Sequence, residues 1–387
     1  MKLEDACTVF IDGDWIESKD QSNIGIRLIQ TGNIGIGEYL EKDNKAKYVS
    51  EDTFENLKCT EVFPGDILIS RLPEPVGRAC IIPYKDERMI TAVDCTICRP
   101  NEEKVLKEYL CYFMQSTAYY NQLVNSLAGT TRKRISRKNL GKIEIRIPNK
   151  SIQTKVITNL DLVTKLIRLK KEELSIYNDL VKSRFVEMFG DPVTNPHGWD
   201  KVPLSDLAEI KIGPFGTLLH KEDYITGGHA LVNPSHIHDG NIVTDEKLTI
   251  TDEKYAELSA YHLSENDVVM GRRGEMGRCA VVKESGLLCG TGSMIIRSYG
   301  EVRADFLQKI ISFPSFKKTI EDMAVGQTMP NLNVPIVSRL EIIKPPTKVQ
   351  DDYYAFVELT DKSKLTVQQS IDTLQTLKAK LMQDYFG

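Results

Sequence analysis

Arginine and lysine gather in two glycine-containing segments that are predicted to form turns beside strands. AGTTRKRISRKNLGKIEIR, residues 128–146, holds seven cations against Glu144, and MGRRGEMGR, residues 270–278, holds three against Glu275. Arginine is suited to clamping phosphate and to paired hydrogen bonds with guanine in the major groove. Both segments therefore predict loops that contact nucleic acid, and the simpler alternative is a solvated basic surface.

Cysteine and histidine spacings do not complete a metal site. Cys95 and Cys98 form a single C-x-x-C, whereas a zinc site needs a second pair or histidines at ligand spacing. His236 and His238 could place two imidazoles on one strand face, but only His229 lies near them. We expect reduced thiols and no bound metal ion.

Sequence signatures of an enzyme are also missing. The chain has no G-x-x-x-x-G-K-[ST] phosphate loop, no G-x-S-x-G elbow and no H-E-x-x-H. GPFGTLLHK, residues 213–221, lacks phosphate-loop spacing and is better explained as a turn or a groove-facing loop. A nuclease pattern of Asp94, Glu102 and Lys104 falls in a charge-rich helix start, which is usually a solvated face. We expect no catalytic residue and no cofactor on this chain.

Length and composition are those of a globular protein with more than one domain. The chain has 387 residues, of which 41% are hydrophobic and 27% charged, and its net charge is −4. Any nucleic-acid surface must therefore be local. No apolar run approaches the roughly 18–20 residues that span a bilayer, and the N-terminus lacks signal-peptide features. We expect a cytoplasmic protein.

The chain contains an internal repeat. Arg71 aligns with Arg272, and Gly77-Arg78 aligns with Gly277-Arg278 after a one-residue skip. Farther on the offset is a constant 197, as in the pairs Tyr109/Phe306, Gly129/Gly326, Gln153/Gln350, Phe189/Phe386 and Gly190/Gly387. A constant offset over about 80 residues indicates a duplication, so each half ends on the same element.

Each half is predicted to begin with an α+β domain. Short runs such as GDILIS, VGRACII, DVVMG and CAVV indicate strands between turns. Helical patches follow at residues 103–127 and 302–324, and GKIEIRIP or SRLEIIKP then predicts a strand closed by proline. The pattern favours a twisted, mostly antiparallel sheet.

A long amphipathic helix is predicted to follow each domain. Residues 152–188 contain neither proline nor glycine. Apolar residues at coiled-coil spacing form a seam in each copy: Val156, Leu160, Val163, Ile167, Leu174, Tyr177, Val181 and Met188 in the first, and Val357, Val367, Ile371, Leu374 and Leu381 in the second. Lys170 and Arg184, and then Lys364 and Lys378, interrupt the seams. We expect an antiparallel two-helix coiled coil that separates two similar α/β domains related by a pseudo-two-fold axis; two unrelated surface helices are the alternative.

The order of these motifs resembles the DNA-specificity subunit (HsdS) of a Type I restriction–modification system. The resemblance covers essentially the whole chain. It rests on GWDKVPLSDLAEIKIGPFGTLL, LVNPSHIHDGNI, LSENDVVMGRRGEMGRCAVV, SRFVEMFGDP and the glycine loop before the closing strand. The first domain departs from it, because its opening, LEDACTVFIDGDWIESKD, has no obvious counterpart of the first of these motifs.

The resemblance implies a non-catalytic subunit that reads a bipartite, asymmetric DNA target. Residues 1–150 and 191–346 would be target-recognition domains, and residues 151–190 and 347–387 would be conserved spacer helices. Two methyltransferase subunits would dock and bring S-adenosylmethionine. Two restriction subunits, with ATP and magnesium, would join them where the system has restriction activity, so that the complex serves DNA methylation and phage defence.

We predict that double-stranded DNA contacts loops around residues 29–37, 71–78 and 129–137, and around 214–218, 233–240, 272–278 and 326–331. The predicted contact residues are Arg71, Arg78, Thr131, Arg132, Lys133, Arg134, Arg137, Phe215, Thr217, Asn233, Ser235, His236, Arg272, Arg273, Arg278, Gln327, Thr328 and Asn331. The first domain would rely on arginine and the second on polar contacts to base edges. The rival interpretations are a coiled-coil scaffold whose domains bind proteins and a stand-alone enzyme.

Overall fold

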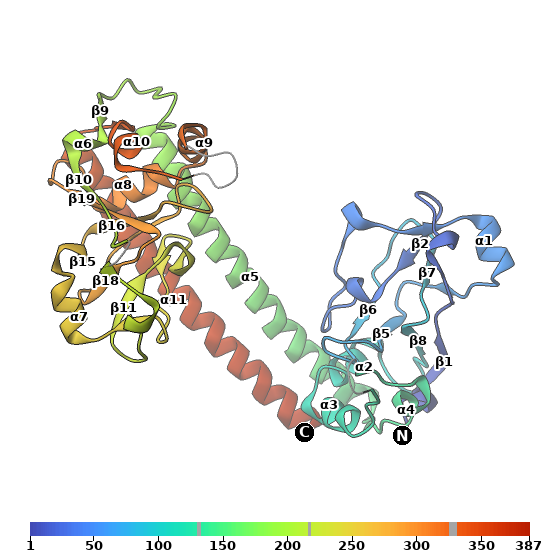
Figure 1. Cartoon of the computed structure of the whole chain (residues 1–387). Helices are drawn as coiled ribbons and strands as arrows, with labels where there is room; N and C mark the ends of the chain where they lie inside the picture. Colours follow the sequence, from blue (N-terminus) through green and yellow to red (C-terminus); the bar gives the residue numbers. More distant parts are fainter. Residues whose placement is uncertain (130–132, 216–217, 325–330) are drawn as a thin grey trace. The chain divides into compact units, whose positions relative to one another are not determined.

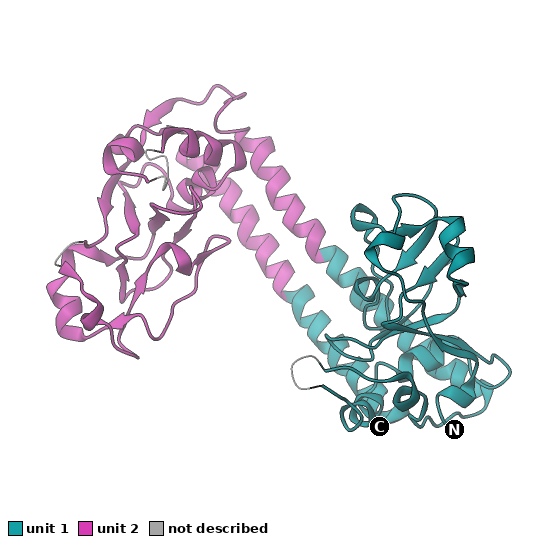
Figure 2. Cartoon of the chain, turned by 45° about the vertical axis from the view of Figure 1, so that its right-hand side comes forward, with its two compact units in different colours: residues 1–173, 366–387 teal, residues 174–365 magenta. Residues whose placement is uncertain are grey.

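The chain divides into two compact units, each with one globular domain and part of both long helices. The computed structural model describes residues 1–129, 133–215, 218–324 and 331–387. Unit 1 comprises Met1–Glu173 and Thr366–Gly387, and unit 2 comprises Leu174–Leu365 (Figure 2). No helix in these described ranges is both long enough and apolar enough to cross a membrane.

Unit 1 contains two four-stranded sheets (Figure 1). The first is antiparallel, in the order β1 (Cys7–Asp12), β8 (Cys95–Pro100), β5 (Ile67–Ser70) and β6 (Ala79–Ile81). The second has the order β3 (Tyr48–Val49), β2 (Ile26–Ile29), β7 (Met89–Thr91) and β4 (Glu61–Val62), and only its β2–β7 pair is parallel. Both sheets are rich in isoleucine and other apolar residues that are buried, which explains why short segments suffice for strands.

Unit 2 repeats this topology strand for strand. Its antiparallel sheet has the order β10 (Ala208–Ile212), β19 (Ser293–Ser298), β16 (Asp267–Gly271) and β17 (Cys279–Val281). Its second sheet has the order β14 (Thr249–Ile250), β11 (His229–Val232), β18 (Leu287–Cys289) and β15 (His262–Leu263), again with one parallel pair, β11–β18. Two small pairs are added, β12 (Ile237–His238) with β13 (Asn241–Ile242) and β9 (Lys201–Pro203) with β20 (Glu341–Ile343). The duplication seen in the sequence is therefore a duplication of fold.

The opening of unit 1 does have a counterpart in unit 2, contrary to the sequence comparison. β1 pairs with β8 at the edge of its sheet just as β10 pairs with β19. The two edge strands share an extended backbone but hardly any side chains. Because edge strands are half-exposed, packing constrains their sequence weakly, and the match was invisible to residue alignment.

Short helices pack on both kinds of sheet. Unit 1 has α1 (Glu51–Asn56), α2 (Lys107–Phe113), α3 (Thr117–Val124) and α4 (Arg137–Gly141). Unit 2 has α6 (Leu204–Leu207), α7 (Asp252–Glu257), α8 (Ala304–Ile311), α9 (Pro314–Met323) and α10 (Val334–Ser338). Of these, α1 and α7 pack on the sheets that contain the parallel pair. In the main core of unit 1, Tyr109 and Leu110 of α2 pack with Ile67 and Ile69 of β5, and α8 packs on β16 and β17 in the same way in unit 2.

The predicted closing strand forms in unit 2 only. SRLEIIKP contains β20, which pairs with β9. The prediction for GKIEIRIP was wrong, because this segment makes a single isolated bridge, between Lys2 and Glu144. Around this bridge the amides of Leu3 and Ile145 donate to the carbonyls of Ile143 and Met1, both over 2.8 Å, so the pairing is present but too short to form a ladder.

Both predicted long helices are present and pack together. They are α5 (Lys150–Phe189) and α11 (Thr347–Phe386). In unit 1, Asn159 Nδ2 donates to Tyr385 Oη over 2.7 Å, and in unit 2, Tyr353 Oη donates to the carbonyl of Val181 over 3.3 Å. The beginning of each helix therefore meets the end of the other, which is an antiparallel arrangement. Every predicted seam residue is buried or half-buried.

The end of each long helix packs into the domain of the other repeat. Phe189 of α5 lies 4.8 Å from Phe306 in unit 2, measured between ring centroids, and Phe386 of α11 lies 5.1 Å from Tyr109 in unit 1. These are the same pair of positions in the two repeats, at the offset of 197. The repeated Phe-Gly ending is thus an aromatic anchor.

The start of each long helix is held by a fully buried glutamine. Gln153 Oε1 accepts from the amide of Leu106 over 2.8 Å, and Gln350 Oε1 accepts from the amide of Arg303 over 3.0 Å. Their Nε2 atoms donate to the carbonyls of Pro148 and Pro345 over 2.8 and 2.9 Å. The same hydrogen bonds therefore attach each domain to the helix that follows it.

We expect Gln350→Leu to lower the free energy of unfolding of unit 2 by about 1–3 kcal/mol, because a buried amide and carbonyl lose their partners. Gln369→Leu, at an exposed position of the same helix, is the matched control and should change stability little. Urea unfolding of the full chain measures both. Equal midpoints for the two variants would contradict the attachment role.

Candidate nucleic-acid interface

Within each unit, described residues of two of the predicted loops are hydrogen-bonded to one another. In unit 2, the amide of Leu332 donates to the carbonyl of Arg272 over 3.0 Å, and Arg273 and Asn331 form an antiparallel bridge. In unit 1, the amide of Ile135 donates to the carbonyl of Arg71 over 3.3 Å. In both units, the turn after β5 or β16 is therefore joined to the segment just before the closing segment.

A third segment completes each loop cluster. The 3₁₀ turn η3 (Thr31–Asn33) follows β2, and the turn η7 (Pro234–His236) follows β11. In η3, Asn33 Oδ1 accepts from the amide of Gln30, which precedes the turn, over 3.1 Å. In η7, His236 Nδ1 lies 3.3 Å from the amide of Asn233 and 2.7 Å from the carbonyl of Leu231, and the shorter contact requires Nδ1 to donate to that carbonyl. The signal in the sequence is IQTGNI against VNPSHI, a pairing at an offset of 203 that the alignment missed.

Arg78 is turned into the protein and not toward solvent. Its side chain is only 9% exposed, and its guanidinium donates to the carbonyls of Ile34 at 2.7 Å and Thr31 at 2.8 Å. It also donates to the carbonyls of Leu72 and Pro75, at 3.0 and 3.1 Å. Burial lowers the pKa of Arg78. One fork therefore fastens two loops of unit 1 together.

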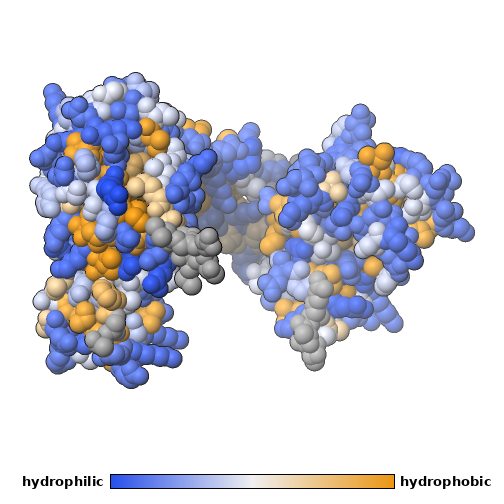
Figure 3. Space-filling model, turned by 45° about the horizontal axis from the view of Figure 1, so that its top comes forward, coloured by the Kyte–Doolittle hydropathy of each residue, from blue (hydrophilic) through white to orange (hydrophobic). Residues whose placement is uncertain are grey.

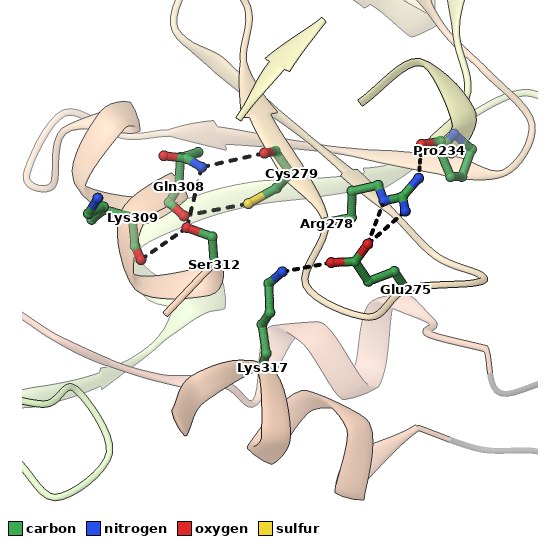
Figure 4. Close-up of polar contacts among 8 residues, drawn as sticks. All are labelled: Pro234, Glu275, Arg278, Cys279, Gln308, Lys309, Ser312 and Lys317. Carbon is green, nitrogen blue, oxygen red and sulfur yellow. Dashed lines mark hydrogen bonds and ion pairs between the residues drawn. The ribbon is translucent and has the colours of Figure 1, made fainter. Parts of the chain in front are cut away.

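Arg278 has the equivalent place in unit 2 but a different set of partners (Figure 4). It donates to the carbonyl of Pro234 over 3.2 Å and to Glu275 Oε2 over 2.6 Å. Lys317 of α9 contacts the other carboxylate oxygen of Glu275 over 2.9 Å. Hydrogen bonds from Lys317 and Arg278 lower the pKa of Glu275 to about 2, so this carboxylate is charged at neutral pH.

Arg71 and Arg272 are half-buried and bonded within the loops. Arg272 Nε donates to the carbonyl of Leu332 over 3.1 Å, and Arg71 Nε lies 3.4 Å from Asp12 Oδ1 and its Nη2 bonds to the carbonyl of Val93. Burial, and then the neighbouring charge of Arg273, lower the pKa of Arg272. Both guanidiniums shape the turn from which adjacent residues project.

The remaining predicted contacts differ in accessibility. Lys133, Arg134, Arg137, Phe215, Ser235 and Arg273 are exposed, and Asn233 and Asn331 are half-buried. His236 is buried, and its Nδ1 lies 2.7 Å from the carbonyl of Leu231. Thr131, Arg132, Thr217, Gln327 and Thr328 lie outside the described residues.

The candidate metal ligands do not converge. Cys95 and Cys98 are buried free thiols of β8, three positions apart and thus on opposite faces of the strand. His238 is exposed on β12, whereas His236 is buried in η7. Across the residues that the structure describes, no group of three or more His, Cys, Asp or Glu side chains could hold a metal ion.

Comparison with known proteins identifies the family. The family described as "Type I restriction modification DNA specificity domain" matches residues 1–176 and 196–376, which is most of both repeats. The chain belongs to this family. Its members are specificity subunits, so the predicted resemblance and the prediction of a non-catalytic subunit are both confirmed by membership.

Individual relatives are distant in sequence. The MjaX type I restriction enzyme specificity subunit of Methanocaldococcus jannaschii is 22% identical over 197 residues, which are 50% of this chain and 45% of that protein. The chain thus matches less than half the length of this curated relative.

Two solved structures show the same fold over the whole chain. The specificity subunit from M. genitalium is 13% identical with a TM-score of 0.54, covering 100% of this chain and 95% of that one. A chain from a study of complex assembly and conformational transition of the type I R-M system is 15% identical with a TM-score of 0.68, covering 100% and 96%. The predicted fold class is confirmed.

We expect Arg78→Lys to lower the free energy of unfolding of unit 1 by about 2–3 kcal/mol, because lysine keeps the charge but cannot bond several carbonyls in a fork. Arg137→Lys, at an exposed position, is the control. Thermal unfolding of both variants measures the difference. Unchanged stability of Arg78→Lys would mean that the guanidinium does not hold the loops.

Proposed function

We propose that this chain is the sequence-reading subunit of a Type I restriction–modification complex, with each unit reading one half of a bipartite DNA target. The observation that carries the proposal is the repeated three-loop cluster in a chain of this family. Two domains of one fold with different loops are suited to two different half-sites. Hydrophilic residues cover most of the face seen in Figure 3, with smaller hydrophobic patches between them, which suits a polar ligand such as DNA.

Exposed cations would contact the DNA, whereas inward-facing arginines would position the loops. Lys133, Arg134 and Arg137 of unit 1 and Arg273 of unit 2 are free of ion pairs among the described residues and can bind phosphate or guanine. The inward-facing Arg78 and Arg278 act as positioning residues. The loops of unit 1 carry more cations than those of unit 2, so we propose an asymmetric target.

The long helices offer a surface for partner subunits. A second stripe of apolar residues runs along α5 at heptad spacing and is exposed: Leu162, Leu166, Leu169, Ile176 and Leu180. It differs from the seam that faces α11. We propose that two methyltransferase subunits dock on the helices through such stripes and supply S-adenosylmethionine. Restriction subunits, where present, would supply the ATP- and magnesium-dependent steps, and the complex would act in the cytoplasm.

We expect Arg273→Ala to weaken specific DNA binding by about 1–3 kcal/mol if it reads a base, or to reduce the salt dependence by about one phosphate contact if it does not. Lys283→Ala, an exposed cation of the same unit, is the control. Binding of the chain with its methyltransferase is measured on target and scrambled duplexes at several salt concentrations. Unchanged binding by Arg273→Ala would favour the scaffold whose domains bind proteins.

We expect Ile176→Glu to reduce assembly with the methyltransferase at least about tenfold, because a carboxylate would be buried in an apolar contact. Asn178→Glu adds the same charge at an exposed position off the stripe. Size-exclusion chromatography of the mixed subunits compares them. Equal assembly of both variants would remove this face of α5 from the docking surface.

The proposal as a whole is tested by sequencing methylated bases in cells that carry the complex. The expected result is one two-part motif. Substitutions in the loops of unit 1 should change only one half of it, and those in unit 2 the other. Methyl transfer by the purified chain alone would instead favour a stand-alone enzyme.

A further inference from the structure

Unit 2 contains a cavity of about 570 Å³ between the end of α5 and the domain. Side chains from α5, the β12–β13 turn, the turn after β16, α8 and α9 line it. The charged lining residues are Lys182, Asp239, Glu275, Arg278, Lys309 and Lys317. Four cations thus face two carboxylates, and Glu275 already binds two of those cations.

Among the cations that line the cavity, Lys309 is half-buried and lacks an ion-pair partner among the described residues. It lies on α8, and no carboxylate among the described residues is within ion-pair distance of its Nζ. Burial, and then the charges of Lys182 and Lys364, lower the pKa of Lys309. Lys182 and Lys364 have partners on their own helices, Asp179 at 3.6 Å and Asp361 at 2.9 Å. A half-buried lysine beside two further cations is unfavourable unless an anion joins it.

The surroundings of Lys309 also offer neutral donors. Gln308 lies on the same helix, and Ser312 directly follows its end. Ser312 Oγ donates to the carbonyl of Lys309 over 3.2 Å, and Gln308 Nε2 donates to Ser312 Oγ over 3.3 Å and to the carbonyl of Cys279 over 3.5 Å (Figure 4). All three bonds are long for their types, so these groups can turn toward a bound anion. The charges come from several directions, which suits a tetrahedral oxyanion better than a planar carboxylate.

In the corresponding cavity of unit 1, polar and charged lining residues pair with one another. At the offset of 197, Tyr112 stands in place of Lys309 and Gln115 in place of Ser312. Tyr112 Oη donates to Asp161 Oδ1 over 2.5 Å, and Lys378 Nζ lies 6.0 Å from the centroid of its ring. Acidic residues balance the basic ones in this lining, with Glu38, Glu108 and Asp161 against Arg168, Lys171 and Lys378. Of these two described cavities, the one in unit 2 therefore has the excess of positive charge.

We propose that the cavity around Lys309 binds a phosphate group, with one such site in the chain. Lys309 and Lys182 would contact its oxygens, and Lys317 and Arg278 would add to the positive field while holding Glu275. The phosphate could come from a free phosphorylated molecule or from the backbone of DNA. The site is independent of base reading, and so of the proposed function.

The experiment titrates the full chain with inorganic phosphate by calorimetry at constant ionic strength. We expect one phosphate per chain, an affinity at least about tenfold lower for Lys309→Gln and retained binding for Lys309→Arg. Lys283→Gln removes an equal charge from an exposed position of the same unit and should bind like the wild type. Circular dichroism checks that Lys309→Gln is folded, and Lys182→Gln provides a second, weaker loss.

A competition arm distinguishes the two sources. A short duplex that displaces phosphate from the wild type supports the DNA backbone as the source, and a duplex that leaves phosphate bound supports a free phosphorylated molecule. The proposal is overturned if Lys309→Gln binds phosphate as tightly as the wild type, if Lys283→Gln weakens binding equally, or if acetate binds as tightly as phosphate.

Discussion

The packing of each helix end into the opposite repeat's domain is the constraint on which this chain depends. Phe189 is buried in unit 2 and Phe386 packs in unit 1, while buried glutamines fix the starts of the same helices in the other units. Each helix has 40 residues. Since each added residue turns a helix by about 100°, an insertion in one helix would rotate its aromatic end away from its pocket and its seam away from the partner helix. The two lengths must therefore change together.

Between the two repeats, several polar residues that stabilise the core are the same, whereas residues in the surface loops differ. Asp66 and Asp267 are both fully buried, and each accepts a two-pronged bond from an arginine, Arg99 or Arg297. By contrast, the glycine loops before the closing segments differ in charge between the two repeats. Replacing one partner of a buried ion pair leaves the other charge buried and unpaired, which strongly destabilises the fold. Replacing an exposed side chain changes the stability little.

The sequence predicted what depends on repetition and periodicity. The helices, their seams and the equivalence of Gln153 with Gln350 follow from a period and an offset that many residues share. It did not predict the partner of β1 or the missing closing strand of unit 1, because edge pairing depends on backbone neighbours that side chains hardly encode. The direction of Arg78 was equally hidden, because an arginine that binds carbonyls and one that binds phosphate look alike in a sequence.

That ambiguity has a consequence for how recognition can diversify. Arg78 and Arg278 both bind the carbonyl of the first residue in a 3₁₀ turn, Thr31 or Pro234. A carbonyl acceptor is supplied by any residue, so the clamp does not depend on the side chain at that position. Side chains on the clamped turns can then change without loosening the loop. Fixing the backbone through an inward arginine thus separates the stability of the recognition surface from its chemistry.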